Sequence, residues 1–227
     1  MINKLENQFI VSVQASWGEP LYDENAMTAM IKTVLMGGAD ALRLAGARDI
    51  KNAKNIDKNV PVIGITKPKV LPKNWIDEVY ITPNLDEAKS VIDAGADVVA
   101  FDATMRKREV EISKMIDFIH AHSRLAMADI ATFEDAKNAQ DLGVDIVSTT
   151  LSGYTKETQN NSSEPDFELL EKLVKNLDVP VILEGRIWTP NDVKKAFDIG
   201  AYAVVVGSAI TRPHHIVKRF LNYGETK

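Results

Sequence analysis

The chain alternates between short apolar runs and longer stretches in which apolar residues recur every three or four positions. Runs of Val, Ile and Leu with few polar interruptions are typical of strands buried on both faces, and the periodic stretches predict amphipathic helices. Thr and Asn caps begin several of these helices, as in TPNLDEAKS and TPNDVKKAF. Four strands are predicted directly, and they cover residues 9–14, 60–67, 124–130 and 179–185.

A fourfold repeat supplies the other strands. The segments GGADALRL, DAGADVVAFD, DLGVDIVSTT and DIGAYAVVVGS each end a helical pattern at a glycine, and an apolar run starts two or three residues later. Glycine suits the left-handed residue that ends many helices. The equivalent residues are Gly38, Gly95, Gly143 and Gly200, so each interval between them has room for two strand–helix units.

Eight alternating units predict an α/β fold, a single (β/α)8 TIM barrel domain over residues 1–227. A doubly wound open sheet is the alternative, but it requires a glycine-rich turn after the first strand, where this chain has VQASWGEPLYDEN. Residues 78–83, EVYITP, also resemble a strand and would make nine. Because they break the rhythm of the repeat, we interpret them as a short excursion.

Polar side chains follow the apolar runs at the predicted strand ends. The chemistry of a (β/α)8 barrel lies at the carboxyl ends of its strands. Any strand becomes polar near a loop, but Arg43 and Glu184 are flanked by apolar residues. In such surroundings the burial of an unpaired charge is energetically unfavourable. Bringing opposite charges to one face solves that problem and also makes a polar site. The strand-end residues are Gln14, Arg43, Lys67, Asp102, Asp129, Thr149 with Thr150, Glu184, and Gly207 with Ser208.

The last two strands end in EGRIWTP and VVVGSAITRP. Glycines at such turns let backbone N–H groups approach an anion closely, and the loops after strands 7 and 8 are the recurrent phosphate site of this fold. The alternative is that these glycines only turn the chain. The predicted phosphate-binding residues are Gly185, Arg186, Gly207, Ser208 and Arg212.

Composition narrows the classes of partner. The net charge of −5 does not favour binding to nucleic acid or to an anionic membrane. We interpret the basic cluster at 105–109 as a solvated loop. The absence of cysteine excludes disulfides, a thiolate nucleophile and a Cys-type zinc site. No segment approaches 18 apolar residues, so we expect no membrane span and a cytoplasmic location.

Seven segments together carry a family resemblance: ALRLAGARDI, PVIGITK, VVAFDAT, MADIAT, STTLSGYT, ILEGRIWTP and VVVGSAITRP. They are similar to the N-acylmannosamine-6-phosphate 2-epimerases, bacterial enzymes of sialic-acid breakdown. The resemblance implies interconversion of N-acetylmannosamine 6-phosphate and N-acetylglucosamine 6-phosphate, without a metal or organic cofactor. By motif matching it implies an acid/base Lys67, an active-site Glu184, the family's arginine and aspartate at Arg43 and Asp129, a sugar-contacting Gln14 and a phosphate-binding Arg212.

Inversion at carbon 2 requires ring opening, removal and return of a proton, and stabilisation of an oxyanion. Lys67 suits the base if burial and the charge of Arg43 keep its amine neutral, although a phosphate contact, an ion pair or a Schiff base are alternatives. Glu184 suits a second acid/base, for ring opening or for the opposite face of carbon 2. Arg43 is always charged and is therefore suited to stabilising the oxyanion. Asp129 is suited to orienting Arg43 or to binding the sugar hydroxyls, and Thr150 is a further substrate-binding candidate.

Two other classes of function fit parts of the pattern. A metal-dependent epimerase would use Asp102 and Asp129 as ligands, but such sites depend on histidine, and the four histidines fall in helical stretches away from the strand ends. A non-catalytic phosphosugar-binding protein would have no use for Lys67 and Glu184 together. Other phosphate-binding barrel enzymes, such as those of tryptophan or thiamine synthesis, are alternatives that the fold alone would permit. The habits of this fold suggest a homodimer.

Overall fold

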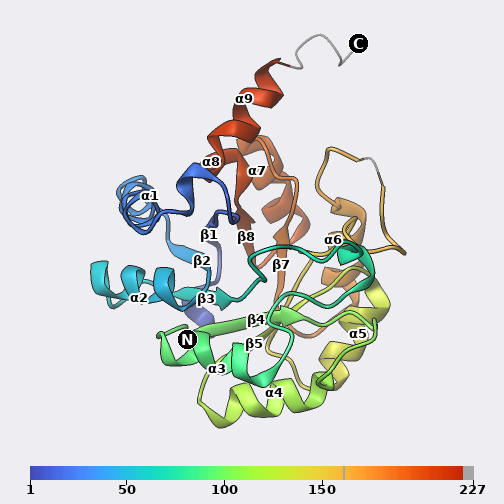
Figure 1. Cartoon of the computed structure of the whole chain (residues 1–227). Coiled ribbons are helices and arrows are strands. Elements are labelled where there is room, and N and C mark those ends of the chain that lie inside the picture. Colours follow the sequence, from blue (N-terminus) through green and yellow to red (C-terminus); the bar gives the residue numbers. More distant parts are fainter. Residues whose placement is uncertain (161, 222–227) are drawn as a thin grey trace.

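The computed structural model of the chain describes residues 1–160 and 162–221, so residues 161 and 222–227 of the predicted domain lie outside it. Eight parallel strands close into one barrel in chain order, with β1 paired to β8, and helices surround it (Figure 1). The predicted (β/α)8 fold is confirmed, and the open-sheet alternative is wrong. The strands are β1 (Gln8–Val13), β2 (Ala41–Ala45), β3 (Val62–Ile65), β4 (Val98–Asp102), β5 (Leu125–Asp129), β6 (Ile146–Ser148), β7 (Val181–Glu184) and β8 (Ala203–Val206).

The helices follow the strands as the periodic stretches predict. Caps explain several of their starts: Thr132 and Thr189 each accept a bond from the amide three residues on, and that residue's carboxylate accepts a bond from the cap's own N–H. The helices are α1 (Glu24–Met36), α2 (Ala47–Ile56), α3 (Leu85–Asp93), α4 (Ile112–Ala121), α5 (Phe133–Asp141), α6 (Phe167–Asn176), α7 (Pro190–Ile199), α8 (Ser208–Thr211) and α9 (Pro213–Leu221), with short 3-10 turns at Ile2–Lys4, Pro20–Tyr22 and Trp75–Asp77.

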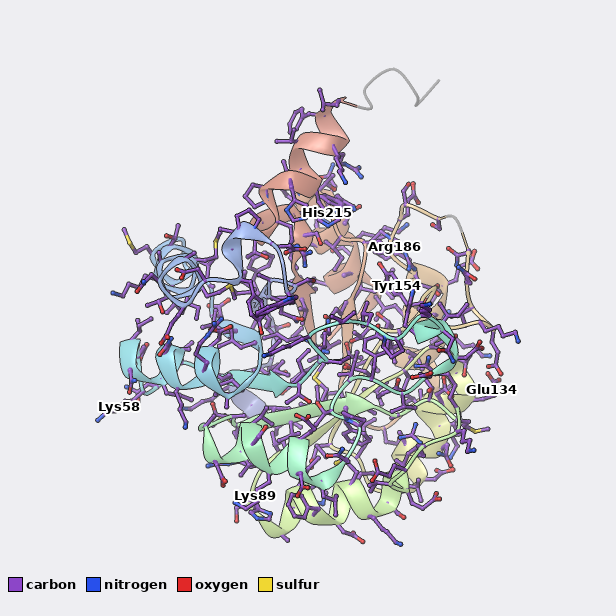
Figure 2. All side chains as sticks on the ribbon, viewed as in Figure 1. Lys58, Lys89, Glu134, Tyr154, Arg186 and His215 are labelled. Carbon is purple, nitrogen blue, oxygen red and sulfur yellow. The ribbon has the colours of Figure 1, made fainter. Side chains whose placement is uncertain are left out.

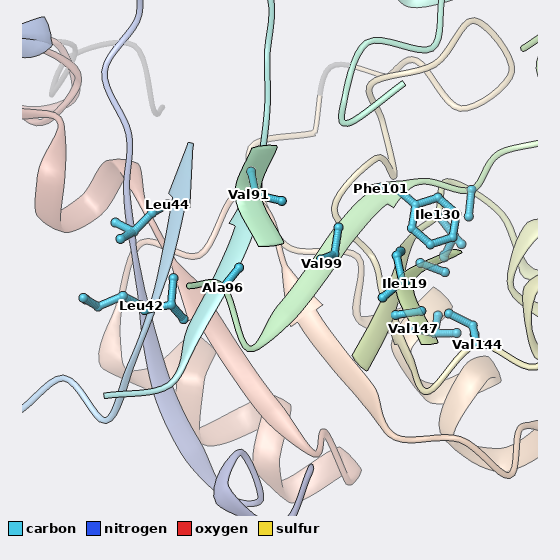
Figure 3. Packing of buried hydrophobic residues seen from close by; sticks show 14 of the residues in the cluster. Leu42, Leu44, Val91, Ala96, Val99, Phe101, Ile119, Ile130, Val144 and Val147 are labelled. Atoms are coloured by element: carbon cyan, nitrogen blue, oxygen red, sulfur yellow. The ribbon is translucent and has the colours of Figure 1, made fainter. Parts of the chain in front are cut away.

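Alternate residues of each strand belong to two separate cores. One core fills the barrel and includes Ile10, Ile63 and Met127. The other lies between strands and helices and includes Leu42 and Phe101, which Figure 3 shows on the outer surface of the sheet. Because side chains alternate along a strand, every second residue points into the barrel, and the last inward position of each strand lies at its carboxyl-terminal mouth.

The fourfold repeat is a repeated set of hydrogen bonds at the opposite, amino-terminal end of the barrel. Gly38, Gly95, Gly143 and Gly200 all have positive φ, as the C-cap interpretation predicts. Two residues after each glycine, a backbone N–H donates to the neighbouring strand, to Phe9, Val62, Ala126 and Val181. In the first three repeats that residue is an aspartate, Asp40, Asp97 or Asp145, whose carboxylate also accepts the N–H of Phe9, Val62 or Ala126.

The segment 78–83 is an excursion and not a ninth strand, as predicted. It follows the Trp75–Asp77 turn and returns the chain to the barrel mouth, where Thr82 N–H donates to Thr66 O and Asp102 N–H donates to Ile81 O. The predicted strand over residues 60–67 is shorter in the structure, so Lys67 lies two residues beyond β3, in the loop.

The final helix differs from the others. Helix α9 has no buried residue and projects away from the barrel in Figure 1. None of the helices in the described ranges is long and apolar enough to cross a membrane.

We predict that Asp97→Ala lowers the free energy of unfolding by roughly 1–3 kcal/mol, because the buried Val62 N–H loses an acceptor and Lys54 loses the carboxylate 2.6 Å from its Nζ. Urea denaturation measures the change. Asp93→Ala is the matched control: its pair with Lys89 is exposed, so we expect a loss below about 0.5 kcal/mol. Equal losses in the two variants would contradict the structural role of the repeat.

Candidate active site

The polar residues of the inward-facing set gather at the barrel mouth. Along β1 and the residue after it, the series Ile10, Ser12, Gln14 runs from the barrel core to the mouth, and in β7 Ile182 is followed by Glu184. The mouth holds a cavity of about 280 Å³. Among the residues that line it are nine of the predicted site residues: Gln14, Lys67, Thr150, Glu184, Gly185, Arg186, Gly207, Ser208 and Arg212.

Arg43 and Asp129 lie beneath this cavity and do not line it. Arg43 donates from Nη1 to Asp129 Oδ1 at 3.1 Å and from Nη2 to Asp129 Oδ2 at 2.5 Å, and Nη1 is also 3.1 Å from Glu184 Oε2. Arg43 is 1% exposed and Asp129 is fully buried. Burial alone lowers the pKa of Arg43, but the two carboxylates outweigh it and raise the pKa, so the guanidinium stays charged.

Glu184 faces the cavity from the top of this ion-pair group. Its side chain is 13% exposed, and its Oε2 lies 3.1 Å from Thr150 Oγ1, which is also 2.7 Å from Asp129 Oδ1. Burial raises the pKa of Glu184 above its ordinary value, and although Arg43 opposes this, the net direction is upward. A carboxyl group in this state exchanges a proton closer to neutral pH than an ordinary glutamate does.

Lys67 faces the same cavity from the loop after β3. Its Nζ donates to Gln14 Oε1 at 2.9 Å, and Gln14 Nε2 donates to Ser12 Oγ at 2.9 Å. Lys67 is an exposed residue whose accessible surface adjoins the cavity, and its amine is close enough to Arg43 and Glu184 to be affected by their charges. Burial lowers the pKa of Lys67 to about 8, and the positive charge of Arg43 adds to this effect.

Strand order sets the geometry between the two groups. In a closed barrel of eight strands, β3 and β7 lie on opposite sides. Lys67 therefore approaches the cavity from one side and Glu184 from the other, with Gln14 and Thr150 contributed by the loops that follow β1 and β6. An amine with a lowered pKa and a carboxyl group with a raised pKa can move protons on two faces of one small molecule.

The turns after β7 and β8 form one end of the cavity. Gly185 has φ 110° and Arg186 has φ 57°, so two successive residues adopt the left-handed region. Gly207 precedes the short helix α8, and a Cβ at Gly207 would lie 3.3 Å from the Cβ of Ser12. Backbone N–H groups in such turns and at the start of a helical turn are available to an anion.

The two predicted arginines of these loops differ in what they contact. Arg186 donates from Nε to Glu164 O at 2.7 Å and from Nη1 to Ser152 O at 2.6 Å, and its guanidinium lies over the ring of Tyr154, next to it in Figure 2. Its side chain therefore holds the loop after β6. Arg212 pairs with Glu19, and its buried Nε has no partner among the described residues.

Sequence reasoning missed Ser12, Tyr80 and Glu19. Ser12 was detectable, because it precedes Gln14 by two residues and must share its face of β1. Tyr80 lies in the excursion and lines the cavity, and burial raises its pKa to about 12, so it remains a hydrogen-bond donor. No sequence signal links Glu19 to Arg212, because 193 residues separate them.

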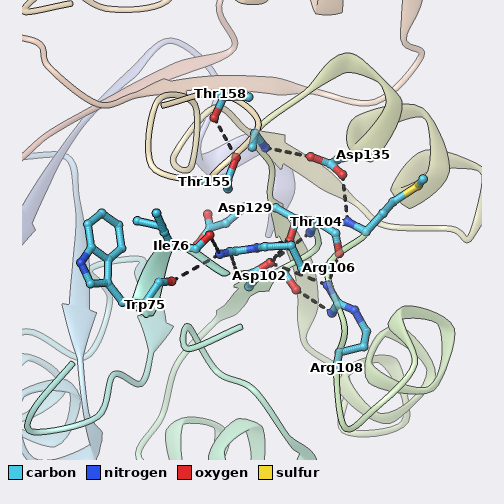
Figure 4. A network of polar contacts seen from close by, with 12 residues as sticks. Trp75, Ile76, Asp102, Thr104, Arg106, Arg108, Asp129, Asp135, Thr155 and Thr158 are labelled. Atoms are coloured by element: carbon cyan, nitrogen blue, oxygen red, sulfur yellow. Dashed lines mark hydrogen bonds and ion pairs between the residues drawn. The ribbon is translucent and has the colours of Figure 1, made fainter. Parts of the chain in front are cut away.

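Asp102 reaches the mouth but is occupied by arginines from its own loop. Arg106 Nη2 donates to Asp102 Oδ2 at 2.5 Å, and Arg106 Nη1 donates to Ile76 O at 2.9 Å (Figure 4). Arg108 Nη1 donates to Asp102 O at 2.8 Å. The interpretation of residues 105–109 as a solvated loop is therefore wrong for these two arginines, because a buried carboxylate at the end of β4 requires cations.

The histidines lie outside the cavity. His120 contacts Asp145 at 2.7 Å on the amino-terminal side of the barrel, and His214 and His215 lie on α9. Within residues 1–160 and 162–221, no three His, Asp or Glu side chains are grouped as a metal ion requires. The two aspartates considered as ligands, Asp102 and Asp129, are each held by arginine.

Comparison with known proteins gives a consistent result. Residues 27–225 match the family model described as "Putative N-acetylmannosamine-6-phosphate epimerase". Two relatives described as "Putative N-acetylmannosamine-6-phosphate 2-epimerase" are 47% identical (Clostridium perfringens, 97% of this chain and 98% of the relative) and 46% identical (Caldanaerobacter subterraneus, 98% and 93%).

Solved structures agree with these relatives. The N-acetylmannosamine-6-phosphate 2-epimerase from Clostridium perfringens superposes with a TM-score of 0.91 at 46% identity, covering 98% of this chain and 95% of that one. A thiamine phosphate pyrophosphorylase from Pyrococcus furiosus reaches a TM-score of 0.60 at 17% identity, covering 97% of this chain and 98% of that one. The second similarity shows a shared barrel fold alone.

We predict that the amine of Lys67 titrates near pH 8, because burial and Arg43 disfavour its charged form. Competitive acylation over a pH series, read by peptide mass spectrometry, measures the midpoint for this single lysine. Its reactivity should rise steeply between about pH 7 and 9. A midpoint at or above the ordinary lysine value would leave almost no neutral amine near neutral pH and would contradict its assignment as a base.

Proposed function

The chain belongs to the N-acetylmannosamine-6-phosphate epimerase family, and we propose that it interconverts N-acetylmannosamine 6-phosphate and N-acetylglucosamine 6-phosphate by inverting carbon 2. One observation carries the proposal. An amine with a lowered pKa and a carboxyl group with a raised pKa line one cavity that ends at two glycine turns. A phosphosugar needs both the acid/base pair and the anion site.

The hydrogen on carbon 2 is not acidic in the closed ring. Opening the hemiacetal places an aldehyde at carbon 1, and loss of the carbon 2 proton then gives an enolate whose charge rests on oxygen 1. Glu184 is the group we assign to ring opening, because it faces the cavity and burial raises the pKa of its carboxyl group, which makes it a better proton donor than an ordinary glutamate. These steps move only protons, so we propose that no metal or organic cofactor takes part.

Lys67 is the base that removes the carbon 2 proton. The neutral amine accepts the proton, and the ammonium that results lies beside the enolate and stabilises it. Gln14 holds the amine through its Oε1 at 2.9 Å. The return of a proton to the opposite face inverts the centre, and we assign that step to Glu184, because it approaches the cavity from the strand across the barrel.

Arg43 and Asp129 act through the groups above them. A permanently charged arginine at a strand end is expected beside the oxyanion, but the guanidinium of Arg43 is paired with two carboxylates under the cavity floor. We propose that it holds Glu184 in place and disfavours the charged form of Lys67, and that Asp129 fixes the position of Arg43. Thr150 lies between the two carboxylates and can contact a sugar hydroxyl from the cavity wall.

The phosphate group belongs at the turns after β7 and β8. We propose that it accepts bonds from the backbone N–H groups around Gly185 and Gly207, from Ser208 Oγ, and from Arg212. A guanidinium has five N–H donors, so Arg212, whose side chain is 19% exposed and lines the cavity, can keep Glu19 and still donate to the phosphate. We assign Arg186 only a contact from its backbone N–H to the phosphate, because its side chain holds the loop after β6.

We also propose a cytoplasmic location and a homodimer. A phosphosugar carries charge that an apolar bilayer excludes, so it is formed and consumed where phosphorylation takes place. Helix α9 supports the dimer: Val217, Phe220 and Leu221 recur at helical spacing and are 55%, 76% and 70% exposed. A second copy of the chain is the partner that could cover this stripe symmetrically.

Removal of either acid/base group tests the reaction. We predict that Lys67→Ala and Glu184→Ala each lower kcat by roughly a thousandfold or more and leave the far-ultraviolet circular dichroism unchanged. Lys73→Ala, an exposed lysine in the same loop, should keep the activity. The assay is proton NMR of N-acetylmannosamine 6-phosphate in deuterium oxide, with and without EDTA, and the product should carry deuterium at carbon 2.

Two outcomes of that assay would contradict the proposal. Turnover close to the wild-type rate in Lys67→Ala would show that Lys67 is not the base. Calorimetric binding of the substrate by the wild-type chain without any epimer would favour the non-catalytic phosphosugar-binding alternative.

The dimer has its own test. We predict that sedimentation at micromolar concentration gives about twice the mass of one chain, and that Val217→Asp with Phe220→Asp gives a monomer, because charge opposes burial of the apolar stripe. The matched control, Met36→Asp, alters an exposed apolar residue on α1 and should leave the mass unchanged. A wild-type monomer would contradict the proposal.

A further inference from the structure

A second cavity opens directly from the first. It has a volume of about 690 Å³, against about 280 Å³ for the catalytic cavity. Four side chains line both cavities, Gln14, Lys67, Tyr80 and Arg212, so they form the boundary through which one space continues into the other. We call this second space the annex. Its other walls are the β1–α1 loop, the β2–α2 turn and the loop that follows β3.

We propose that the annex is a subsite for the acyl chain on the substrate nitrogen and that it admits neutral acyl groups longer than acetyl. The inference rests on the proposed function, which places the phosphate at the glycine turns and carbon 2 at Lys67. The nitrogen is bonded to carbon 2, so its acyl group begins at the boundary that Lys67 and Gln14 form. The catalytic cavity is small for a ligand site, for which roughly 300–1,000 Å³ is usual, and the acyl group therefore continues into the annex.

The rim of the annex is apolar and exposed. Trp17, Val70 and Leu71 line it, and they are 57%, 73% and 47% exposed. Trp17 packs edge-on against Tyr22 with ring centroids 5.3 Å apart, which holds an aromatic surface over the opening. A hydrocarbon chain that passes beneath these side chains covers apolar area on both partners, which favours its binding.

The floor of the annex is built from small residues. Ala45, Gly46 and Ala47 form the turn from β2 into α2, and all three line the space. A Cβ built on Gly46 would meet no atom within 4 Å, so the room beside this turn is empty of side chains. Gly46 has φ 91°, a conformation that glycine adopts without strain, and the turn can therefore remain narrow. The space extends beyond what a single methyl group fills.

Apart from Lys67, the charged groups around the annex are balanced by groups of opposite charge. Arg48 donates to both carboxylate oxygens of Asp49, from Nε at 2.8 Å and from Nη2 at 3.2 Å. Lys69 lies over the ring of Trp17, with its Nζ 5.0 Å from the centroid, and Glu87 supplies a negative charge in the same lining. Arg212 is paired with Glu19. Because these charges are compensated, the annex favours a neutral chain over an anionic one.

A series of acyl substrates tests the proposal. We expect the wild-type chain to epimerise the 6-phosphates of N-acetyl-, N-propanoyl- and N-pentanoyl-mannosamine, with kcat/KM for the pentanoyl compound at least equal to that for the acetyl compound. Each added methylene that becomes buried can raise kcat/KM by up to about fourfold. The N-succinyl compound, of similar length but anionic, should be at least about tenfold worse than the pentanoyl compound.

A blocking variant locates the effect. Ser16→Trp introduces an indole at an exposed position of the annex wall, and we expect it to lower kcat/KM for the pentanoyl substrate by roughly tenfold and for the acetyl substrate by less than about threefold. Ser162→Trp, an exposed loop serine that lines neither cavity, is the matched control and should change neither value. Thermal unfolding of each variant checks that the fold is intact.

The outcomes separate the subsite from the reaction. If the wild-type chain epimerised the acetyl substrate and discriminated against the pentanoyl substrate by about a hundredfold, the annex would be no acyl subsite. Equal effects of Ser16→Trp on all substrates would also overturn it. If the acetyl substrate itself were not epimerised, the proposed function would be overturned and the acyl subsite with it.

Discussion

The ion pairing of Arg43 with Asp129 and Glu184 is the interaction on which the site depends. A guanidinium that is 1% exposed would be very unfavourable alone, and each carboxylate would be unfavourable without it. Together they join β2, β5 and β7 across the barrel mouth. Burial lowers the pKa of Lys67, and the fixed positive charge of Arg43 adds to this effect, while the two carboxylates oppose it. The buried charges therefore determine where the substrate-facing groups stand and how readily they exchange protons.

The rest of the mouth divides its polar residues between support and contact. Asp102 ends β4 in the same layer, but Arg106 and Arg108 occupy it and tie the loop after β3 to the loop after β4. Arg186 supports the loop after β6 in a similar way. The residues left facing the cavity come from β1, β7, β8 and the loops after β3 and β6. Support on one side of the barrel thus leaves the other side open to a ligand.

Most of the fold and much of the site were predictable because both follow from local rules. The alternation of apolar runs with periodic stretches specified eight strand–helix units, and the glycines at positions 38, 95, 143 and 200 marked where four helices end. The period of two along a strand then placed Gln14, Glu184 and their counterparts on the inward face. A polar residue that points inward at the carboxyl end of an apolar strand must lie at the mouth of the barrel.

The sequence alone determined the barrel, the layer of polar strand ends and the family to which the chain belongs. Only the tertiary structure decided which of those ends contact the cavity. Arg43 and Asp129 lie beneath the floor, Asp102 is occupied by arginines that the sequence suggested were solvated, and Tyr80 enters from an excursion. The physical reason is distance along the chain. Strand periodicity acts between neighbours, whereas charge pairing joins residues 86 positions apart, and it depends on which loops fold back over the mouth.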